Sequence, residues 1–306
     1  MGLLAAALAM WAAIYLFAYE REYAGVPVEA GRAMVMEGSI EAVSGKSVLF
    51  RPDGSQWLYA VSSRDGACPL EAGERYRIKG EAYPLQAPCG HGIFDRERWG
   101  YLHGIIAGIR LDEYCRNGPG DWRSRFRAFS LRLRERAASL LREGAPPDDE
   151  ARQVMVSAVL GDKTDARPET MAKFLESGCM HVFAVSGMHV GVAAMLVLGM
   201  LRLLHVRPRA ARLSCILLLA AYVFVTGMSA SALRAFIMAS VWLLAFVLRR
   251  KGHPANILAL AFILLCLMNP LQVFQPGFQL SFCVFAAIAC LAGWLSREKP
   301  LWSPDP

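Results

Sequence analysis

The positions of charged residues divide the chain into a mixed first half and a strongly apolar second half. No Asp, Glu, Lys or Arg occurs from Ser177 to Leu201 or from Gly252 to Ser296, and only Arg234 interrupts the stretch from Leu213 to Leu248. A membrane-spanning helix needs about 20 predominantly apolar residues. The pattern therefore predicts spans at about residues 2–19, 182–201, 213–228, 232–248, 254–270 and 279–296.

The first of these spans, in residues 1–19, is expected to be an uncleaved N-terminal transmembrane anchor. Its apolar run, Gly2–Tyr19, has 18 residues, and no Lys or Arg precedes it. The apolar region of a secretory signal is shorter, roughly 7–15 residues, and follows a basic start. A cleaved secretory signal is the alternative.

Residues 20–117 favour a small, external β domain. Runs with strand-like composition are separated by Gly and Pro, at Met34–Val43, Ser47–Arg51, Trp57–Val61, Arg75–Tyr83 and Ile105–Leu111. Five short strands in this length predict an OB-like barrel. OB folds bind single strands by stacking bases on aromatic rings. Candidate rings for DNA contact are Trp57, Tyr59, Tyr76 and Tyr83, with filling of the barrel core as the alternative.

Residues 118–145 are expected to form a basic amphipathic helix. Apolar residues recur every three or four positions, which is the helical period, at Trp122, Phe126, Phe129, Leu133, Ala137 and Leu140. Arginines fill much of the remainder. Such a helix is typical of a membrane interface; contact of its arginines with DNA phosphates is the alternative.

Composition and charge support membrane insertion and give a topology. The 306 residues are 55% hydrophobic and 19% charged, whereas soluble domains have about 25% charged residues. The net charge of +7 arises late, because residues 182–306 hold 10 Lys and Arg but 2 Asp and Glu. Two short loops carry most of these cations, Arg202, Arg207, Arg209 and Arg212 in the first and Arg249, Arg250 and Lys251 in the second. Short basic loops lie on the cytoplasmic side, which places residues 20–181 on the outer face of the membrane and both termini in the cytoplasm.

Cys68 and Cys89 are candidates for a disulfide. They are 21 residues apart in Gly- and Pro-rich surroundings, and an oxidising outer face would let them pair. Two free thiols, or a competing pairing with Cys115, are the alternatives.

Several kinds of chemistry have no motif in the sequence. A P-loop, an EF-hand, a Cys-x2-Cys pair and His-Glu-x2-His are all absent, so no cofactor and no metal site are expected. Ser186 and His189 could be compared with a serine nucleophile and its base. In intramembrane serine proteases the base lies on a separate helix, and here no Asp or Glu lies between Glu176 and Glu298 to orient it. The chain is therefore not expected to be an enzyme.

Three short segments interrupt the apolar second half with small and polar residues, namely Cys179–Gly191, Val225–Ala235 and Pro276–Phe282. Irregular backbone at membrane depth usually lines a protein cavity or water path, and polar groups there raise a functional hypothesis. In this order the segments resemble the competence domain of the ComEC family, the bacterial inner-membrane channel for DNA uptake. The matching positions are Ala184–Gly191, then Thr226, Gly227, Ser231, Arg234 and Ala235, then Gly277–Phe282, with Leu160–Lys163 before them.

The resemblance implies an α-helical polytopic membrane protein with an external small β-barrel (OB-like) domain, in which residues 146–306 form about five spans of a competence-type transmembrane domain. It implies a channel component for uptake of single-stranded DNA during natural transformation. The residues that would line the DNA path are Ser186, Gly187, His189, Gly191, Thr226, Gly227, Ser231, Arg234, Gln279 and Ser281. The implied partners are single-stranded DNA, the lipid bilayer, an external DNA receptor and cytoplasmic helicase-like or DNA-binding proteins, and a homodimer is left open.

The match to the family has departures. Ala230 stands where a Pro is common, and the His-x-His-x-Asp-His motif of the metallo-β-lactamase-like domain that often ends family members is absent. We therefore expect the N-terminal part of such a channel. A permease for another solute and an inactive truncated fragment are the alternative functions.

Individual residues also leave alternatives open. Arg234 could contact phosphates, or extend from a helix end to the outer interface. His181 and His189 could line the path or pack through hydrogen bonds. Gln279 and Ser281 are two positions apart, about 200° on a regular helix, so they cannot both face one small site.

Overall fold

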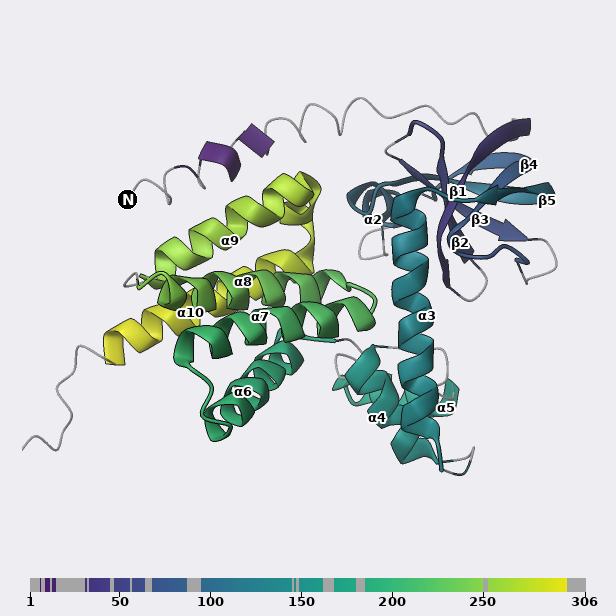
Figure 1. Cartoon of the computed structure of the whole chain (residues 1–306). Coiled ribbons are helices and arrows are strands. Elements are labelled where there is room, and N and C mark those ends of the chain that lie inside the picture. Colours follow the sequence, from purple (N-terminus) through teal and green to yellow (C-terminus); the bar gives the residue numbers. More distant parts are fainter. Residues whose placement is uncertain are drawn as a thin grey trace, which may run out of the picture. The chain divides into compact units, whose positions relative to one another are not determined.

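The computed structural model describes residues 6, 9–11, 13–14, 31, 33–44, 47–55, 57–63, 68–86, 95–144, 146, 149–161, 168–179, 185–249 and 253–295 (Figure 1). The chain forms two compact units. One consists of Arg21–Val185 together with Phe224–Met228, and contains the strands. The other consists of Met1–Glu20, Ser186–Val223 and Ser229–Pro306, and is helical.

The strands of the first unit close into a five-stranded barrel. They are β1 (Ala33–Ser44), β2 (Ser47–Pro52), β3 (Leu58–Ser63), β4 (Glu74–Pro84) and β5 (Ile105–Pro119), in the order β1-β2-β3-β5-β4, and β4 pairs back with β1. All neighbours are antiparallel except β3 and β5, which run parallel. The small barrel expected from the sequence is thus confirmed, while the closer assignment to the OB fold stays a prediction.

The barrel core consists of alternate residues of these strands, as expected for strands with one buried face. The fully buried side chains include Ile40, Val48, Phe50, Val61, Ile78 and Ile109. Tyr76 belongs to this core, and the ring of Tyr83 covers Gly108, its partner across β4 and β5. Tyr59 is half-buried, and this burial raises the pKa of its hydroxyl. Trp57 instead stacks on Tyr101, with 5.7 Å between ring centroids.

Strand β5 is longer than the sequence predicted. The apolar run ends at Leu111, but the strand continues to Pro119 and pairs with β4 from Ala107 to Pro119. The side chains of the extension are mostly exposed, and three of them are charged, so hydropathy gives no sign of a strand there. The extension is held by backbone pairing and by ion pairs to β4, Lys79–Glu113 and Arg116–Glu74.

Helices complete the barrel-containing unit. They are α2 (Arg96–Leu102), α3 (Trp122–Arg142), α4 (Glu150–Leu160) and α5 (Pro168–Glu176). The basic helix predicted near residues 121–143 is therefore present as α3. Its small residue Ala128 is buried against Gly73, which lies just before β4. Its C-terminal part packs through Ala138 on Val156 and Leu160 of α4.

The helical unit contains α6 (Gly187–Leu203), α7 (Pro208–Val225), α8 (Ala230–Val247), α9 (Pro254–Met268), the 3-10 turn η2 (Pro270–Phe274) and α10 (Pro276–Leu295). Helix α7 begins at Pro208 rather than near residue 213. Arg209 and Arg212 therefore lie in its first turns and not in a loop, which corrects the sequence-based expectation. Proline suits the first turn of a helix because its fixed φ is already helical and it needs no hydrogen-bond acceptor there.

Two of the described helices, α7 and α8, are long and apolar enough to cross a membrane. Helices α6 and α9 and the apolar part of α10 are shorter. Of the first predicted span, residues 9–11 and 13–14 are helical, and Met10 and Ile14 pack on the cluster formed by Leu265, Val273 and Phe278.

Candidate functional site

The first matched segment forms the start of helix α6. Ser186 is the N-cap, and its backbone N–H donates to Nδ1 of His189 over 3.2 Å. The Oγ of Ser186 lies 3.0 Å from the same nitrogen. An imidazole nitrogen that accepts from an N–H carries a lone pair, so the ring proton of His189 is on Nε2. His189 thus acts as the third-position partner of a capping box, a role more often filled by Glu or Gln.

The second matched segment links α7 to α8. Thr226 is buried, and Gly227 has a φ of 79°, a left-handed conformation that glycine adopts without strain. Ser229 caps α8 by accepting the N–H of Ala232 over 3.3 Å. Ser231 follows in the first turn of α8 and is half-buried.

Arg234 joins the second matched segment to the third. Its side chain leaves α8 and donates from Nη2 to the carbonyl oxygen of Gly277, 3.1 Å away, in the first turn of α10. The hydroxyl of Ser281 donates to the same oxygen over 2.8 Å. Arg234 is 5% exposed, so it is a buried charge rather than a side chain reaching the surface.

The first matched segment meets the second through two small residues. A Cβ placed on Gly187 of α6 would lie 3.6 Å from the Cβ of Ala235 of α8. The first turn of α6 is therefore in van der Waals contact with the helix that carries Arg234. The first turns of α6 and α10 thus both contact the N-terminal part of α8. The contact with α10 joins residues 43 positions apart in the chain, Arg234 and Gly277.

The remaining positions of the expected DNA path are placed as follows. Gln279 donates from Nε2 to the carbonyl of Val273 over 3.1 Å, so it and Ser281 bind different carbonyls. Gly191 faces open space on α6. Thr226 and Gly227 belong to the barrel-containing unit. His181 lies outside the described residues.

Helix α3 contacts the turn that carries Thr226 and Gly227. Ser130, fully buried on α3, donates its hydroxyl to the carbonyl of Phe224 over 2.5 Å. The ring centroids of Phe126 and Phe129 lie 4.7 and 5.9 Å from the ring centroid of Phe224. Sequence reasoning missed this contact; its one sequence sign was a serine within the apolar face of α3.

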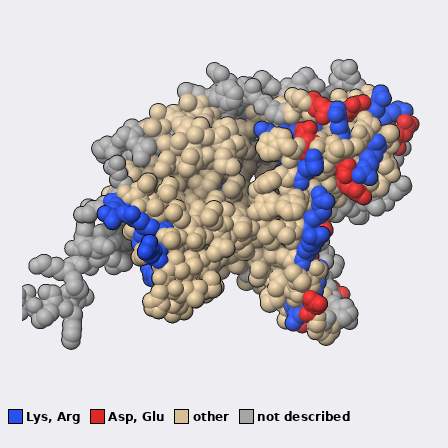
Figure 2. Space-filling model, in the orientation of Figure 1, with Lys and Arg blue, Asp and Glu red and all other residues tan. Residues whose placement is uncertain are grey.

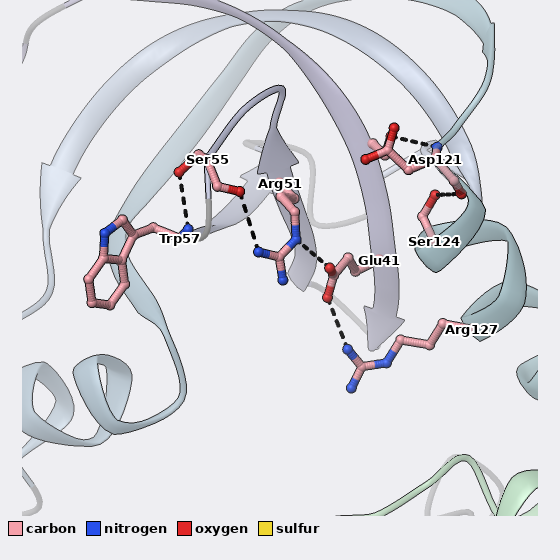
Figure 3. A network of polar contacts seen from close by, with 8 residues as sticks. Glu41, Arg51, Ser55, Trp57, Asp121, Ser124 and Arg127 are labelled. Atoms are coloured by element: carbon pink, nitrogen blue, oxygen red, sulfur yellow. Dashed lines mark hydrogen bonds and ion pairs between the residues drawn. The ribbon is translucent and has the colours of Figure 1, made fainter. Parts of the chain in front are cut away.

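A polar network ties α3 to the barrel (Figure 3). The buried carboxylate of Glu41 on β1 accepts from Nε of Arg51 over 2.5 Å and from Nη1 of Arg127 over 2.9 Å. The hydroxyl of Ser39 accepts the N–H of Asp121 just before α3 begins. The orientation of α3 on the barrel is therefore set by specific bonds as well as by packing.

Charge differs sharply between the units. The described residues of the helical unit include no Asp or Glu, whereas arginine occurs at positions 202, 207, 209, 212, 234 and 249. The face drawn in Figure 2 shows blue without red over α6 to α9, and both colours over the barrel and α3. Among the described residues, no group of three or more His, Cys, Asp and Glu could hold a metal ion.

The disulfide candidates are only partly described. Cys68 is a half-buried thiol whose pKa is raised by burial, an effect that a hydrogen bond with the backbone of Leu70 partly offsets. Cys89 lies outside the described residues, so its pairing with Cys68 stays a prediction. Cys115, the competing partner, is an exposed thiol on β5.

Comparisons with known proteins define the class. Residues 158–306 match the model of the Competence protein family. The chain is 34% identical over 160 residues to ComE operon protein 3 of Bacillus subtilis. This alignment covers 52% of this chain and 20% of that protein. The match of residues 158–306 and the identity to ComE operon protein 3 together confirm the resemblance to the ComEC family.

A second relative extends over the whole chain. The chain is 24% identical over 319 aligned positions to the uncharacterized protein YcaI of Escherichia coli. This alignment covers 100% of this chain and 38% of that protein. The chain thus spans well under half the length of both curated relatives. No solved structure matches it.

Proposed function

We propose that this chain is a membrane component of DNA uptake during natural transformation, and that single-stranded DNA passes along its helical unit from the outer face to the cytoplasm. The family of residues 158–306 and the similarity to ComE operon protein 3 support a role in competence. Because the chain spans only part of these longer relatives, its activity, substrate and partners are proposals.

The membrane setting is supported by the surface of the helices. Several large apolar side chains on α6, α7, α9 and α10 are at least 67% exposed, namely Met195, Leu196, Leu217, Leu267 and Leu280. A soluble helix buries its apolar face and exposes a polar one, and a contiguous apolar surface marks a membrane or protein contact. We propose a polytopic inner-membrane protein with residues 20–181 on the outer face and both termini in the cytoplasm.

The observation that carries the proposal is the contact between Arg234 and Gly277. It joins two of the three matched segments through a buried cation in a region that, among the described residues, has no acid. Intramembrane charges are costly and mark pathways for ions or substrates. Carboxylates along a path would repel a polyanion such as DNA, so a path that has a buried cation and lacks carboxylates suits DNA.

The mechanism is facilitated passage between helices, without a covalent step. Because the sequence has no P-loop, the direction of transport would come from partners, an external DNA receptor and a cytoplasmic helicase-like or DNA-binding protein. The chain would act as the path and not as the motor. No catalytic group is assigned to Ser186 or His189, whose pairing is accounted for by the helix cap.

Deletion and complementation test this function. A strain that lacks the chain should fail to convert fluorescent, externally added DNA into a DNase-resistant cytoplasmic pool, and the full chain supplied from a plasmid should restore it. DNA bound at the cell surface should stay unchanged, because the receptor is a separate protein. Full uptake in the deletion strain would contradict the proposal and favour a permease for another solute.

A further inference from the structure

Arg234 is a buried cation with few partners. It is 5% exposed, and within the described part of the chain its hydrogen bond is the 3.1 Å contact of Nη2 with the carbonyl of Gly277. Its Nε is buried without a partner among the described residues. A guanidinium has five N–H donors in a planar fork, so most of its capacity to bind an anion is unused.

No group of the described helical unit offsets this charge. The unit's described residues lack Asp and Glu, and burial of an unpaired charge is strongly unfavourable. The carbonyl of Gly277 is a weak substitute because it also accepts the hydroxyl of Ser281. Because the described part of the helical unit supplies no counter-charge, an anionic ligand would stabilise this cation.

The surrounding backbone increases the positive potential. Arg234 lies in the second turn of α8 and reaches the first turn of α10. Helix N-termini carry a partial positive charge and unpaired N–H groups. These helix starts therefore repel the guanidinium and attract an anion.

Gly277 brings the backbone of α10 close to the guanidinium. A Cβ placed on Gly277 would meet Nη2 of Arg234 at 3.4 Å, and no other described heavy atom beyond its own surroundings lies within 4 Å. The next residue of α8, Ala235, has its Cβ 3.6 Å from a Cβ placed on Gly187 of α6. A methyl group at Gly277 would therefore stand in van der Waals contact with the guanidinium.

We infer that Arg234, with the first turns of α8 and α10, binds one phosphodiester group of the DNA backbone. The choice of DNA rests on the function proposed above, and the site itself rests on the buried, uncompensated charge. A phosphodiester is a monoanion with two non-bridging oxygens, and arginine binds such a pair through two parallel N–H donors. Lysine, a point charge without a fork, substitutes poorly in that role.

The test uses the full chain in nanodiscs of phosphatidylcholine and a dye-labelled oligothymidylate. Arg234→Met should weaken binding about tenfold, as expected for loss of charge-assisted hydrogen bonds, and Arg234→Lys should recover part of it. Arg249→Met is the matched control, because Arg249 is an exposed arginine beyond the other end of α8, and it should change binding less than about twofold. Unchanged melting temperatures show that the variants are folded.

A second oligonucleotide identifies the group that is bound. An oligothymidylate with an uncharged methylphosphonate backbone should bind wild type and Arg234→Met equally. Equal weakening of both oligonucleotides by Arg234→Met would overturn the inference and assign Arg234 a packing role. Unchanged binding of the normal oligonucleotide by Arg234→Met would also overturn it.

Two further arms separate this site from the proposed function. If phosphatidylglycerol in the nanodisc abolishes the difference between wild type and Arg234→Met, a lipid headgroup occupies the site and the DNA assignment is overturned. If wild type binds neither oligonucleotide, inorganic phosphate is titrated at constant ionic strength. A melting temperature that rises with phosphate in wild type and not in Arg234→Met supports the anion site while the DNA function fails; no rise overturns both.

Discussion

Glu41 of β1 and Arg127 of α3 are 86 positions apart in the chain and form an ion pair of 2.9 Å between Oε2 and Nη1. The same carboxylate accepts from Arg51 on β2, so both of its oxygens are used (Figure 3). Its side chain is 7% exposed, whereas that of Arg127 is 42% exposed. One buried acid therefore fixes two cations of different elements in the barrel-containing unit.

Removal of this acid should loosen α3 from the barrel. Glu41→Ala leaves Arg51 and Arg127 without their shared carboxylate and should lower the free energy of unfolding by about 3 kcal/mol. Hydrogen exchange of amides in β1 and α3 of the full chain measures the change. Glu37→Ala is the control, because Glu37 is 44% exposed in its pair with Arg75, and it should cost less than about 1 kcal/mol. Equal effects of the two variants would contradict the role assigned to Glu41.

The bond between Ser130 and Phe224 predicts a second stability effect. Ser130→Ala removes the donor to a carbonyl at the end of α7 and should lower the free energy of unfolding by about 1–3 kcal/mol, because a buried acceptor loses its partner. Ser139→Ala provides the comparison, since Ser139 is exposed and donates to Arg136 within α3 itself. That change should stay within about 0.5 kcal/mol. Denaturant titration of both variants measures the free energies of unfolding. An unchanged free energy of unfolding in Ser130→Ala would show that this hydrogen bond does not stabilise the chain.

Gly277 and Gly199 allow a matched pair of substitutions. Both lie in helices, where Ala is favoured over Gly by up to about 1 kcal/mol, so neither Gly277→Ala nor Gly199→Ala should destabilise the chain. Only Gly277→Ala puts a methyl group beside the Arg234 guanidinium. It should reduce uptake of labelled DNA severalfold, whereas Gly199→Ala should leave uptake unchanged. Wild-type uptake by Gly277→Ala would show that the surroundings of the Arg234 guanidinium are not used in transport.

The thiol of Cys68 should react slowly with iodoacetamide near neutral pH. Burial raises its pKa above the ordinary value, and only the thiolate is nucleophilic. A raised pKa means less thiolate at pH 7.5, so alkylation should lag behind that of exposed Cys115, and the lag should shrink as the pH rises. Peptide mapping by mass spectrometry follows both sites.

The same mapping tests the disulfide. If Cys68 pairs with Cys89 on an oxidising outer face, neither residue is labelled in intact cells until a reductant is added. Labelling of Cys68 without reductant would exclude the pairing. A slow reaction that speeds up with pH instead of with reductant identifies burial as the cause.

Local pattern was enough to predict most elements of the fold. Alternation of apolar residues gave the five strands to within a few positions, except for β5, whose end is held by pairing with β4 and not by hydropathy. The start of α7 was predicted too late because hydropathy falls at Arg212 and Arg209, while the backbone is already helical from Pro208. The charged residues thus mark the limit of the apolar part of α7, whereas the helix itself begins earlier, at Pro208.

The site was predicted as a set of positions but not as a set of contacts. Sequence singled out Arg234 as the lone charge of a long apolar stretch, and Gly277 and Ser281 as parts of a separate segment. That Arg234 and Ser281 donate to the same carbonyl depends on how α8 packs on α10, which no periodicity encodes. The cap formed by His189 is local, and its spacing of three from Ser186 was the available sign.

Because residues 224–228 complete a unit otherwise made of residues 21–185, that unit cannot be finished in the order in which the ribosome makes it. When residue 185 has just been synthesised, the acceptor of Ser130 and the ring partner of Phe126 and Phe129 do not yet exist. The final seating of α3 must wait until α7 has been translated. Until then, the nascent chain would expose the aromatic rings of Phe126 and Phe129 on α3.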